Sequence, residues 1–341
     1  MIPSCGSPRY NALLPAKRHS DDHQLRVNRV LDYISRHLDG ELSLARLAQI
    51  GCFSPFHFHR IFQAVCGETL NNHVRRVRLE RAAQLMRAAP RRRITEIALE
   101  TGFPGGAEFS RSFKNHFGRT ASSWDRRSPL EKSKICKAPQ EHPFYALEEL
   151  TRWKNEQQMS VRVSRLHAFL YAYIRVFAPY GNSRLVDAYH ALLAWLANRG
   201  TETREAVFIG MSLDDPSLTP PEKCRYDMGV AFPREPRNRG MLEDIIRGRG
   251  RSRATALPTQ AECSRGGLSL REFEPQEMAS MHCVGDLGNV DRAWHYLYRV
   301  WLPGAKFEPA DLPAMELFVR LPEEIGWTTF DLQACLPVVR R

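Results

Sequence analysis

The chain of 341 residues lacks any apolar run of the ~18–20 residues that a transmembrane helix needs. No apolar core of signal-peptide length opens it, so we expect residues 1–24 to form a disordered leader. Its eight cysteines include no CxxC pair and no zinc-site spacing, a usage that fits the reducing cytoplasm and predicts no metal site. GxSxG, HExxH and PCHR motifs are also missing. We therefore expect no cofactor and no enzymatic activity.

Acidic residues are scarce in the first third of the chain. Residues 1–130 carry 21 Lys/Arg against 11 Asp/Glu, a net of +10, whereas residues 131–341 carry 28 against 27. The length is typical of two domains. The asymmetry indicates an N-terminal domain that binds a polyanion, although a basic surface without a partner would give the same count.

A helix start is expected at Ser54-Pro55, because serine suits the N-cap and proline the first helical position. The helix has one apolar stripe, formed by Phe58, Ile61 and Phe62. Three other side chains lie off this stripe: Phe56, His59 and Arg60. An aromatic ring, an imidazole and a guanidinium at helical spacing suit base-pair edges, although an ordinary amphipathic surface helix would look alike.

Other helices surround this one. Apolar spacing predicts a helix over about 25–37, then a short helix capped by Ser43 and a turn at Gly51. A longer helix is expected over 69–89, and its ~30 Å is close to one turn of DNA. The pattern of 44–67 then recurs about fifty residues later, over 94–118. Two helix-turn-helix units joined by such a helix suit two successive major-groove segments.

Three motifs in this second unit are informative. They are Ile94-Thr95-Glu96-Ile97-Ala98, Thr101-Gly102-Phe103 and Phe109-Ser110-Arg111-Ser112-Phe113-Lys114, and the last is followed by Gly118. With them, residues 25–127 resemble the DNA-binding domain of the AraC/XylS family of bacterial transcription regulators. The resemblance implies double-stranded DNA and RNA polymerase as partners and a place on the nucleoid. It also implies base reading by the outward positions of each second helix, namely Phe56, His59, Arg60, Ala107, Glu108 and Arg111.

The second unit departs from the family pattern. Its recognition helix opens on Pro104-Gly105-Gly106, where a capping or polar residue is usual. Glycine at a helix start costs about 0.5–1 kcal/mol and offers no side chain to DNA. Ala107 can contact only a thymine methyl, and Glu108 would repel phosphates unless it accepts from a cytosine amine. We therefore expect the first unit to be the stronger reader.

A polar, proline-containing linker is expected over 128–158, followed by a C-terminal domain over 159–341. Strand and helix patterns alternate in two similar halves, which predicts an α+β domain of two βαββ repeats with a cleft between them. Between the halves lies an insert, 233–267. We expect a flexible surface loop, with an auxiliary nucleic-acid contact by Arg247, Arg249, Arg251 and Arg253 as the alternative.

The segments Ala172–Arg175, Ala178–Asn182 and Pro313–Phe318 are similar to those of the GyrI-like effector-binding family. This resemblance implies a small effector, cationic or polar, that meets a glutamate in a cleft, here Glu316. Four aromatic residues are candidates for the walls of that cleft, or for plain core: Tyr180, Trp294, Trp301 and Phe318. Glu316 could instead be an exposed acid at a strand end.

Two other functions stay open at this point. Some GyrI-like domains are hydrolases that use a tyrosine and a glutamate, and Tyr180 or Tyr173 with Glu316 would supply such a pair. A protein-binding module of the gyrase-inhibitor type is the second alternative. The fold expected from the sequence is multidomain, with two helix-turn-helix units in an all-α domain before the α+β domain.

Overall fold

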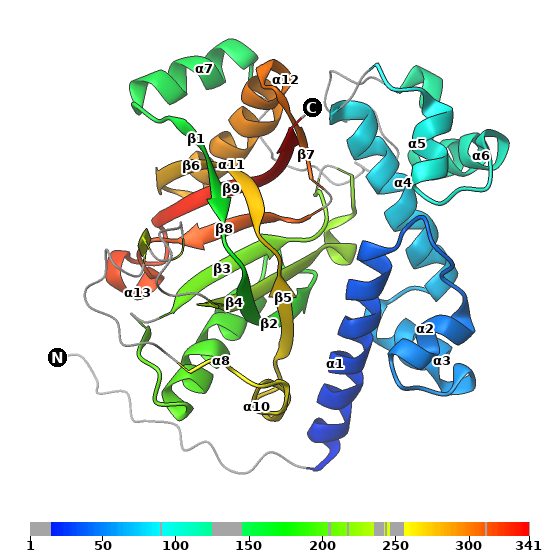
Figure 1. The fold of residues 1–341 in the computed structure, drawn as a ribbon, viewed down its shortest axis with the longest axis horizontal. Helices are drawn as coiled ribbons and strands as arrows, with labels where there is room; N and C mark the ends of the chain where they lie inside the picture. The colour runs from blue at the N-terminus through cyan, green and yellow to red at the C-terminus, as the bar shows by residue number, and fades with distance from the viewer. Residues whose placement is uncertain are drawn as a thin grey trace.

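The computed structural model describes residues 15–88, 91–124, 145–203, 206–216, 218–234, 242, 244–245, 256–310 and 312–340 (Figure 1). Helices form the N-terminal part: α1 (Pro15–Arg36), α2 (Leu44–Ile50), α3 (Pro55–Cys66), α4 (Leu70–Ala88), α5 (Ile94–Glu100) and α6 (Gly106–Phe117). A 3-10 turn follows at Ala121–Ser123. None of the described helices combines the length and hydropathy that a membrane span requires.

The helix starts follow local signals. The hydroxyls of Ser43 and Ser54 accept from the amides of Arg46 and His57, both at 3.4 Å, and so cap α2 and α3. These caps confirm the sequence prediction. The second unit has no side-chain cap at either helix start, and Gly105 precedes α6, as its sequence indicates.

The two helix-turn-helix turns need the same unusual backbone. Cys52 has φ +54° in the first turn, and Gly102 has φ +81° in the second. Only glycine adopts this left-handed region without steric cost. Glycine at 102 is also required by space, because a Cβ there would lie 2.2 Å from the carbonyl oxygen of Leu38.

Each unit has its own apolar core, and α4 contributes to both. The first core is centred on Phe58 and Phe62, and α4 adds Leu70 and Val74. The second core contains three buried phenylalanines of α6, and α4 adds the residues Leu79, Ala82, Ala83, Leu85 and Met86. With 19 residues, α4 is about 28 Å long. It is the rigid element that fixes one unit relative to the other.

The C-terminal part is one antiparallel sheet of nine strands in the order β1-β6-β9-β8-β3-β4-β2-β5, with β7 beside β9. The strands are β1 (Val161–Leu166), β2 (Phe169–Phe177), β3 (Val207–Ser212), β4 (Arg225–Pro233), β5 (Ser269–Phe273), β6 (Gln276–Gly285), β7 (Phe307–Pro309), β8 (Ala314–Phe318) and β9 (Phe330–Arg340). A 3-10 turn, Pro221–Lys223, precedes β4.

Two long helices occupy equivalent places in the two halves of this domain. They are α8 (Arg184–Asn198), between β2 and β3, and α11 (Leu287–Tyr296), after β6. A π-helical turn, Leu297–Trp301, extends α11 into the short α12 (Leu302–Gly304), and α13 (Pro322–Ile325) precedes β9. The predicted α+β class with two similar halves is confirmed.

The sheet has two buried faces. Even-numbered residues of β4, such as Met228 and Val230, pack under α8 and α11 in the larger core. Ala231 of β4 lies with Tyr171, Tyr173 and Ile209 in a second core on the opposite face. This alternation follows from the two-residue period of a strand. It determines which side chains of the C-terminal domain meet the DNA-binding helices.

Helix α1 lies alongside this second face (Figure 1), and a buried ion cluster joins the two. Arg175 of β2 donates to Asp32 of α1 at 2.7 Å and to Asp227 of β4 at 2.7 and 2.8 Å. The hydroxyl of Tyr173 donates to the second oxygen of Asp32 at 2.6 Å. We call Asp32, Arg175 and Asp227 the α1 clamp.

A second buried cluster joins the C-terminal domain to α4. Arg225 of β4 donates to Asp214 at 2.7 and 2.8 Å, and Asp214 lies 3.9 Å from Arg76 of α4. Arg76 in turn donates to Glu68 and Glu80 at 2.7 and 2.9 Å. We call Arg76, Asp214 and Arg225 the α4 clamp. Arg76 lies on the side of α4 that faces the C-terminal domain and is only 5% exposed.

Segment boundaries differ from those expected. Helix α1 begins at Pro15, so its first ten residues fall in the predicted leader, where the polar sequence carries no apolar stripe. Part of the predicted linker is α7 (Leu147–Glu156), whose Leu150 and Trp153 are buried against the C-terminal domain. The predicted insert ends in α10 (Gln260–Arg265), whose Cys263 is fully buried. Its arginines 247, 249, 251 and 253 lie outside the described residues.

Candidate nucleic-acid interface and buried carboxylate

The outward side of α3 carries the residues expected to read bases. Phe56 is 69% exposed, and His59 and Arg60 are also exposed. The guanidinium of Arg60 lies 5.4 Å from the centre of the Phe56 ring. Phe58 and Phe62, on the other side of the helix, are fully buried. The core thus holds α3 rigidly while one aromatic and two basic side chains face solvent.

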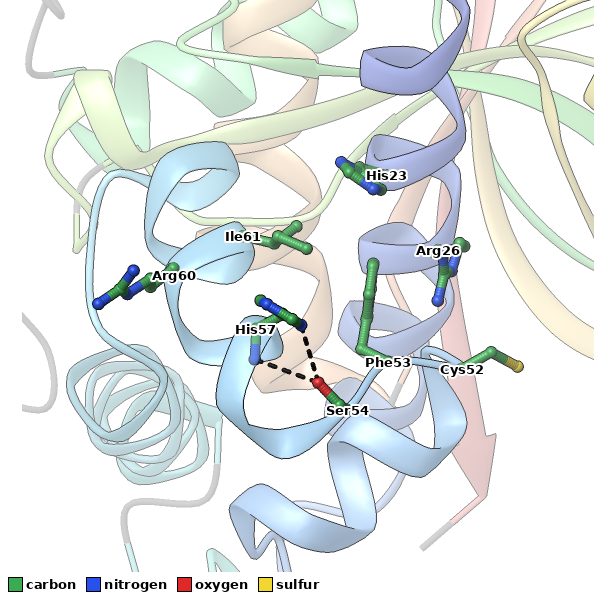
Figure 2. A pocket seen from close by; sticks show the side chains of 8 residues that line it. All are labelled: His23, Arg26, Cys52, Phe53, Ser54, His57, Arg60 and Ile61. Carbon is green, nitrogen blue, oxygen red and sulfur yellow. Dashed lines mark hydrogen bonds between the residues drawn. The ribbon is translucent and has the colours of Figure 1, made fainter.

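A pocket of about 480 Å³ opens beside these residues, between α1 and α3 (Figure 2). Its polar lining comes from His23 and Arg26 on α1 and from His57 and Arg60 on α3, and Phe53 and Ile61 supply apolar wall. Arg26 lies 3.7 Å over the Phe53 ring and donates to the carbonyl of Gly51. The pocket was not predicted, because its lining residues come from two separate segments, 23–26 and 52–61.

The second recognition helix, α6, presents Ala107, Glu108 and Arg111 to solvent. Its inner side is the buried phenylalanine series Phe109, Phe113 and Phe117. Neither Ala107 nor Gly106 has a side chain able to read a base edge by hydrogen bonding. At its three expected reading positions α6 therefore offers one alanine, one acid and one arginine, whereas α3 offers an aromatic ring, an imidazole and a guanidinium.

Glu316 lies on β8 and faces the helix-covered side of the sheet. One carboxylate oxygen accepts from the hydroxyl of Tyr226 at 2.6 Å and the other from the indole of Trp294 at 3.0 Å. Burial raises the pKa of Glu316 above its ordinary value, and these two hydrogen bonds oppose that shift. Among the described residues, no cationic side chain forms an ion pair with Glu316.

Tyr226 reaches Glu316 across a glycine. Gly210 of β3 lies directly opposite Glu316 in the sheet register. A Cβ at position 210 would lie 1.7 Å from the Tyr226 hydroxyl oxygen, so only glycine leaves room for the tyrosine. Sequence reasoning missed both residues, because neither belongs to a motif and the two meet Glu316 only through strand pairing.

The other expected effector residues lie at different distances from this carboxylate. Trp294 contacts it, and Phe318 lies two residues along the same strand face, 7% exposed. Tyr180 is 41% exposed, and its hydroxyl lies 3.4 Å from that of Ser212. Trp301 stacks on Phe307 in a separate small core, and no described contact joins it to Glu316.

Of the two tyrosines expected to pair with Glu316 in a hydrolase, Tyr180 lies near this carboxylate, and burial together with Glu316 raises its pKa. Tyr173 faces the opposite side of the sheet and donates to Asp32. The tyrosine that contacts Glu316 is Tyr226, and burial together with the neighbouring carboxylate raises its pKa well above the ordinary value. A nucleophilic tyrosine needs its phenolate, which this environment disfavours. This environment therefore disfavours covalent chemistry by Tyr226.

Comparison with known proteins assigns both parts of the chain. Residues 47–127 match the family model of a helix-turn-helix domain, and residues 159–338 match that of the GyrI-like small molecule binding domain. SoxS, a regulatory protein of Salmonella typhimurium, is 31% identical over 105 residues, which are 31% of this chain and 97% of SoxS. The chain belongs to the AraC-type regulators that carry a GyrI-like domain.

Two further proteins are similar to this AraC-type regulator. The transcriptional regulator Rob of Salmonella typhimurium is 30% identical over 152 residues, which cover 42% of this chain and 52% of Rob. The structure of SAV2435 bound to tetraphenylphosphonium covers 53% of this chain and 94% of SAV2435, at 9% identity and a TM-score of 0.31. This AraC-type chain is thus a DNA-binding regulator with a small-molecule binding domain.

Proposed function

We propose that the protein is a sequence-specific transcription regulator whose C-terminal domain binds a small organic cation at Glu316. The observation that carries this proposal is a half-buried carboxylate that is held by two neutral donors. A carboxylate that is shielded from water and has no cationic partner binds an incoming cation with a more favourable free energy than an exposed carboxylate does. Trp294 and Tyr226 add aromatic surface of the kind that attracts organic cations.

A pair of probe ions of equal shape and opposite charge tests this site. Tetraphenylphosphonium is expected to bind the full chain in calorimetry, whereas tetraphenylborate, of nearly the same size, is expected to bind at least tenfold more weakly. Glu316→Gln keeps the shape of the side chain and removes its charge, so it should abolish this preference for the cation. Equal affinity of the wild-type protein for both ions would rule out an electrostatic role for Glu316.

For DNA, we propose that α3 supplies most of the base reading and α6 mainly positions the second unit. Phe56, His59 and Arg60 are the proposed reading residues of α3, and Ala107, Glu108 and Arg111 those of α6. The exposed, rigidly held side chains of α3 and the net positive charge of the domain support this assignment. Selection of bound fragments from a random DNA pool should return one strongly specified segment and one weakly specified segment about one helical turn away.

RNA polymerase is the expected protein partner, as the AraC resemblance implies. Leu44 of α2 and Leu99 of α5 are exposed at 40% and 60% and lie outside the recognition helices. Such residues are available to a protein partner while α3 and α6 occupy DNA. Co-purification of the DNA-bound chain with RNA polymerase, lost on Leu99→Ser, would support this assignment, and unchanged co-purification would contradict it.

A further inference from the structure

Three consecutive residues at the start of β4 contact three different parts of the molecule. Arg225 belongs to the α4 clamp and Asp227 to the α1 clamp, and Tyr226 between them donates to Glu316. Side chains alternate along a strand, so Arg225 and Asp227 point toward the DNA-binding helices while Tyr226 points to the effector carboxylate. Strand β4 therefore contacts the Glu316 carboxylate on one face and both ion clusters on the other.

These contacts leave β4 little freedom to move. Asp227 is fully buried, and Arg225 and Arg175 are each 3% exposed. Separating a buried ion from its partner is strongly unfavourable, because neither charge can turn to water. Tyr226 is fixed in the same way, since its ring fills the space that Gly210 leaves open. A displacement at Tyr226 must therefore be accommodated by the residues on either side of it.

We infer that the segment Arg225-Tyr226-Asp227 transmits effector occupancy at Glu316 to the DNA-binding domain. A cation at Glu316 competes with the Tyr226 hydroxyl for the carboxylate and shifts the tyrosine. The shift acts on α1 through Asp227, Arg175 and Asp32, and on α4 through Arg225, Asp214 and Arg76. Since α4 carries core residues of both units, its packing fixes their relative placement on DNA.

The chain offers a matched control for this route. Tyr189 of α8 is 3% exposed in the same core and donates its hydroxyl to the carboxylate of Glu323. It thus shares burial, chemistry and sheet face with Tyr226 but lies off β4. Tyr226→Phe and Tyr189→Phe each remove one buried hydroxyl from one carboxylate. Only the first variant interrupts the proposed route.

Hydrogen exchange of the full chain, followed by mass spectrometry, tests the route without any ligand. Tyr226→Phe is expected to raise amide exchange in α1 and α4 by about fivefold or more, the lower end of ordinary coupling between sites. Tyr189→Phe is expected to leave both helices at wild-type rates. Changes confined to β3, β4 and β8 in the first variant, or equal changes in both variants, would overturn the inference.

A second arm uses tetraphenylphosphonium and rests on the proposed effector site. The cation should alter exchange in α1 and α4 of the wild-type chain and of Tyr189→Phe, but not of Tyr226→Phe. If the cation does not bind, the effector proposal fails, whereas the ligand-free comparison still decides the route. If it binds and leaves α1 and α4 unchanged in the wild-type chain, transmission through β4 is wrong.

Discussion

Arg175 joins the two domains by donating to Asp32, a residue 143 positions earlier in the chain, at 2.7 Å. The guanidinium has almost no exposed surface, the Tyr173 hydroxyl donates to the other oxygen of Asp32, and Arg271 lies 3.5 Å from the first oxygen. The neighbouring Asp227 and Asp32 raise the pKa of Arg175 above its ordinary value, in opposition to burial. The DNA-binding helices are therefore a fixed part of the same folded body as the sheet.

Asp32→Asn is expected to lower the free energy of unfolding by about 3 kcal/mol, because it leaves part of the buried positive charge uncompensated. Asp22→Asn is the matched control. Asp22 belongs to the same helix and pairs with Arg26, but its side chain is 61% exposed, so less than about 1 kcal/mol is expected. Urea denaturation compares the variants. Equal effects would show that burial does not strengthen the interdomain pair.

Two glycines with similar backbone angles should respond differently to alanine. Gly102→Ala places a methyl 2.2 Å from the Leu38 carbonyl oxygen, so the free energy of unfolding is expected to fall by more than about 3 kcal/mol. Gly67, at φ +67°, has no atom near its missing Cβ, so Gly67→Ala should cost only the ~1–2 kcal/mol of left-handed backbone. Thermal unfolding measures both. Equal losses of stability would mean that the positive φ angle alone, and not the contact with Leu38, determines the cost of alanine.

Arg60→Ala should weaken binding to the selected DNA by about 1–3 kcal/mol and change affinity for random DNA little, since base contacts carry the specificity. Arg152→Ala, on α7 and away from α3 and α6, serves as the control and should change neither affinity. Fluorescence anisotropy at fixed salt concentration gives the four affinities. An equal loss on both DNAs would assign Arg60 to a phosphate rather than to a base.

Stability should fall between about pH 6.5 and pH 8 because of Glu80, next to the α4 clamp. Burial raises the pKa of Glu80 to about 8. The charge of Arg76 opposes this rise, and the charge of Asp214 increases it. Arg225 and His116 also face this carboxyl. The native state thus holds a proton that the unfolded chain releases near pH 4.5, as an ordinary glutamate does. Over these 1.5 pH units the loss amounts to about 2 kcal/mol.

Glu80→Gln should remove this decline. Below about pH 6.5 two histidines, the buried His73 and the half-buried His116, act in the opposite direction, because loss of solvent lowers the pKa of each to about 4. The unfolded chain then binds protons that the native state excludes, so stability falls again toward pH 4 in both proteins. Urea denaturation between pH 5 and pH 8.5 resolves the two limbs. A wild-type curve that stays flat above pH 6.5 would contradict a protonated Glu80.

Local patterns in the sequence determined the helices and the exposed sides of α3 and α6. Ser54 caps α3 and Phe56 points outward because capping and helical spacing depend on neighbours within a few residues. The alternating strand and helix patterns similarly predicted the α+β class of the C-terminal domain and its two similar halves. The family motifs identified Glu316, and Trp294 was named as a candidate neighbour of it. All of these signals lie within short segments of chain.

Tertiary structure alone decided which distant residues meet. Tyr226 and Glu316 are 90 positions apart and meet only because β3, with Gly210, lies between their strands. Arg76 is a charged residue of a type that is usually exposed, yet it is buried and lies 3.9 Å from Asp214 of the other domain. Burial and long-range pairing depend on how whole elements pack, which no local pattern encodes. The sequence therefore determined the separate parts of the regulator, whereas the tertiary structure decided that β4 contacts Glu316 on one face and the ion clusters with α1 and α4 on the other.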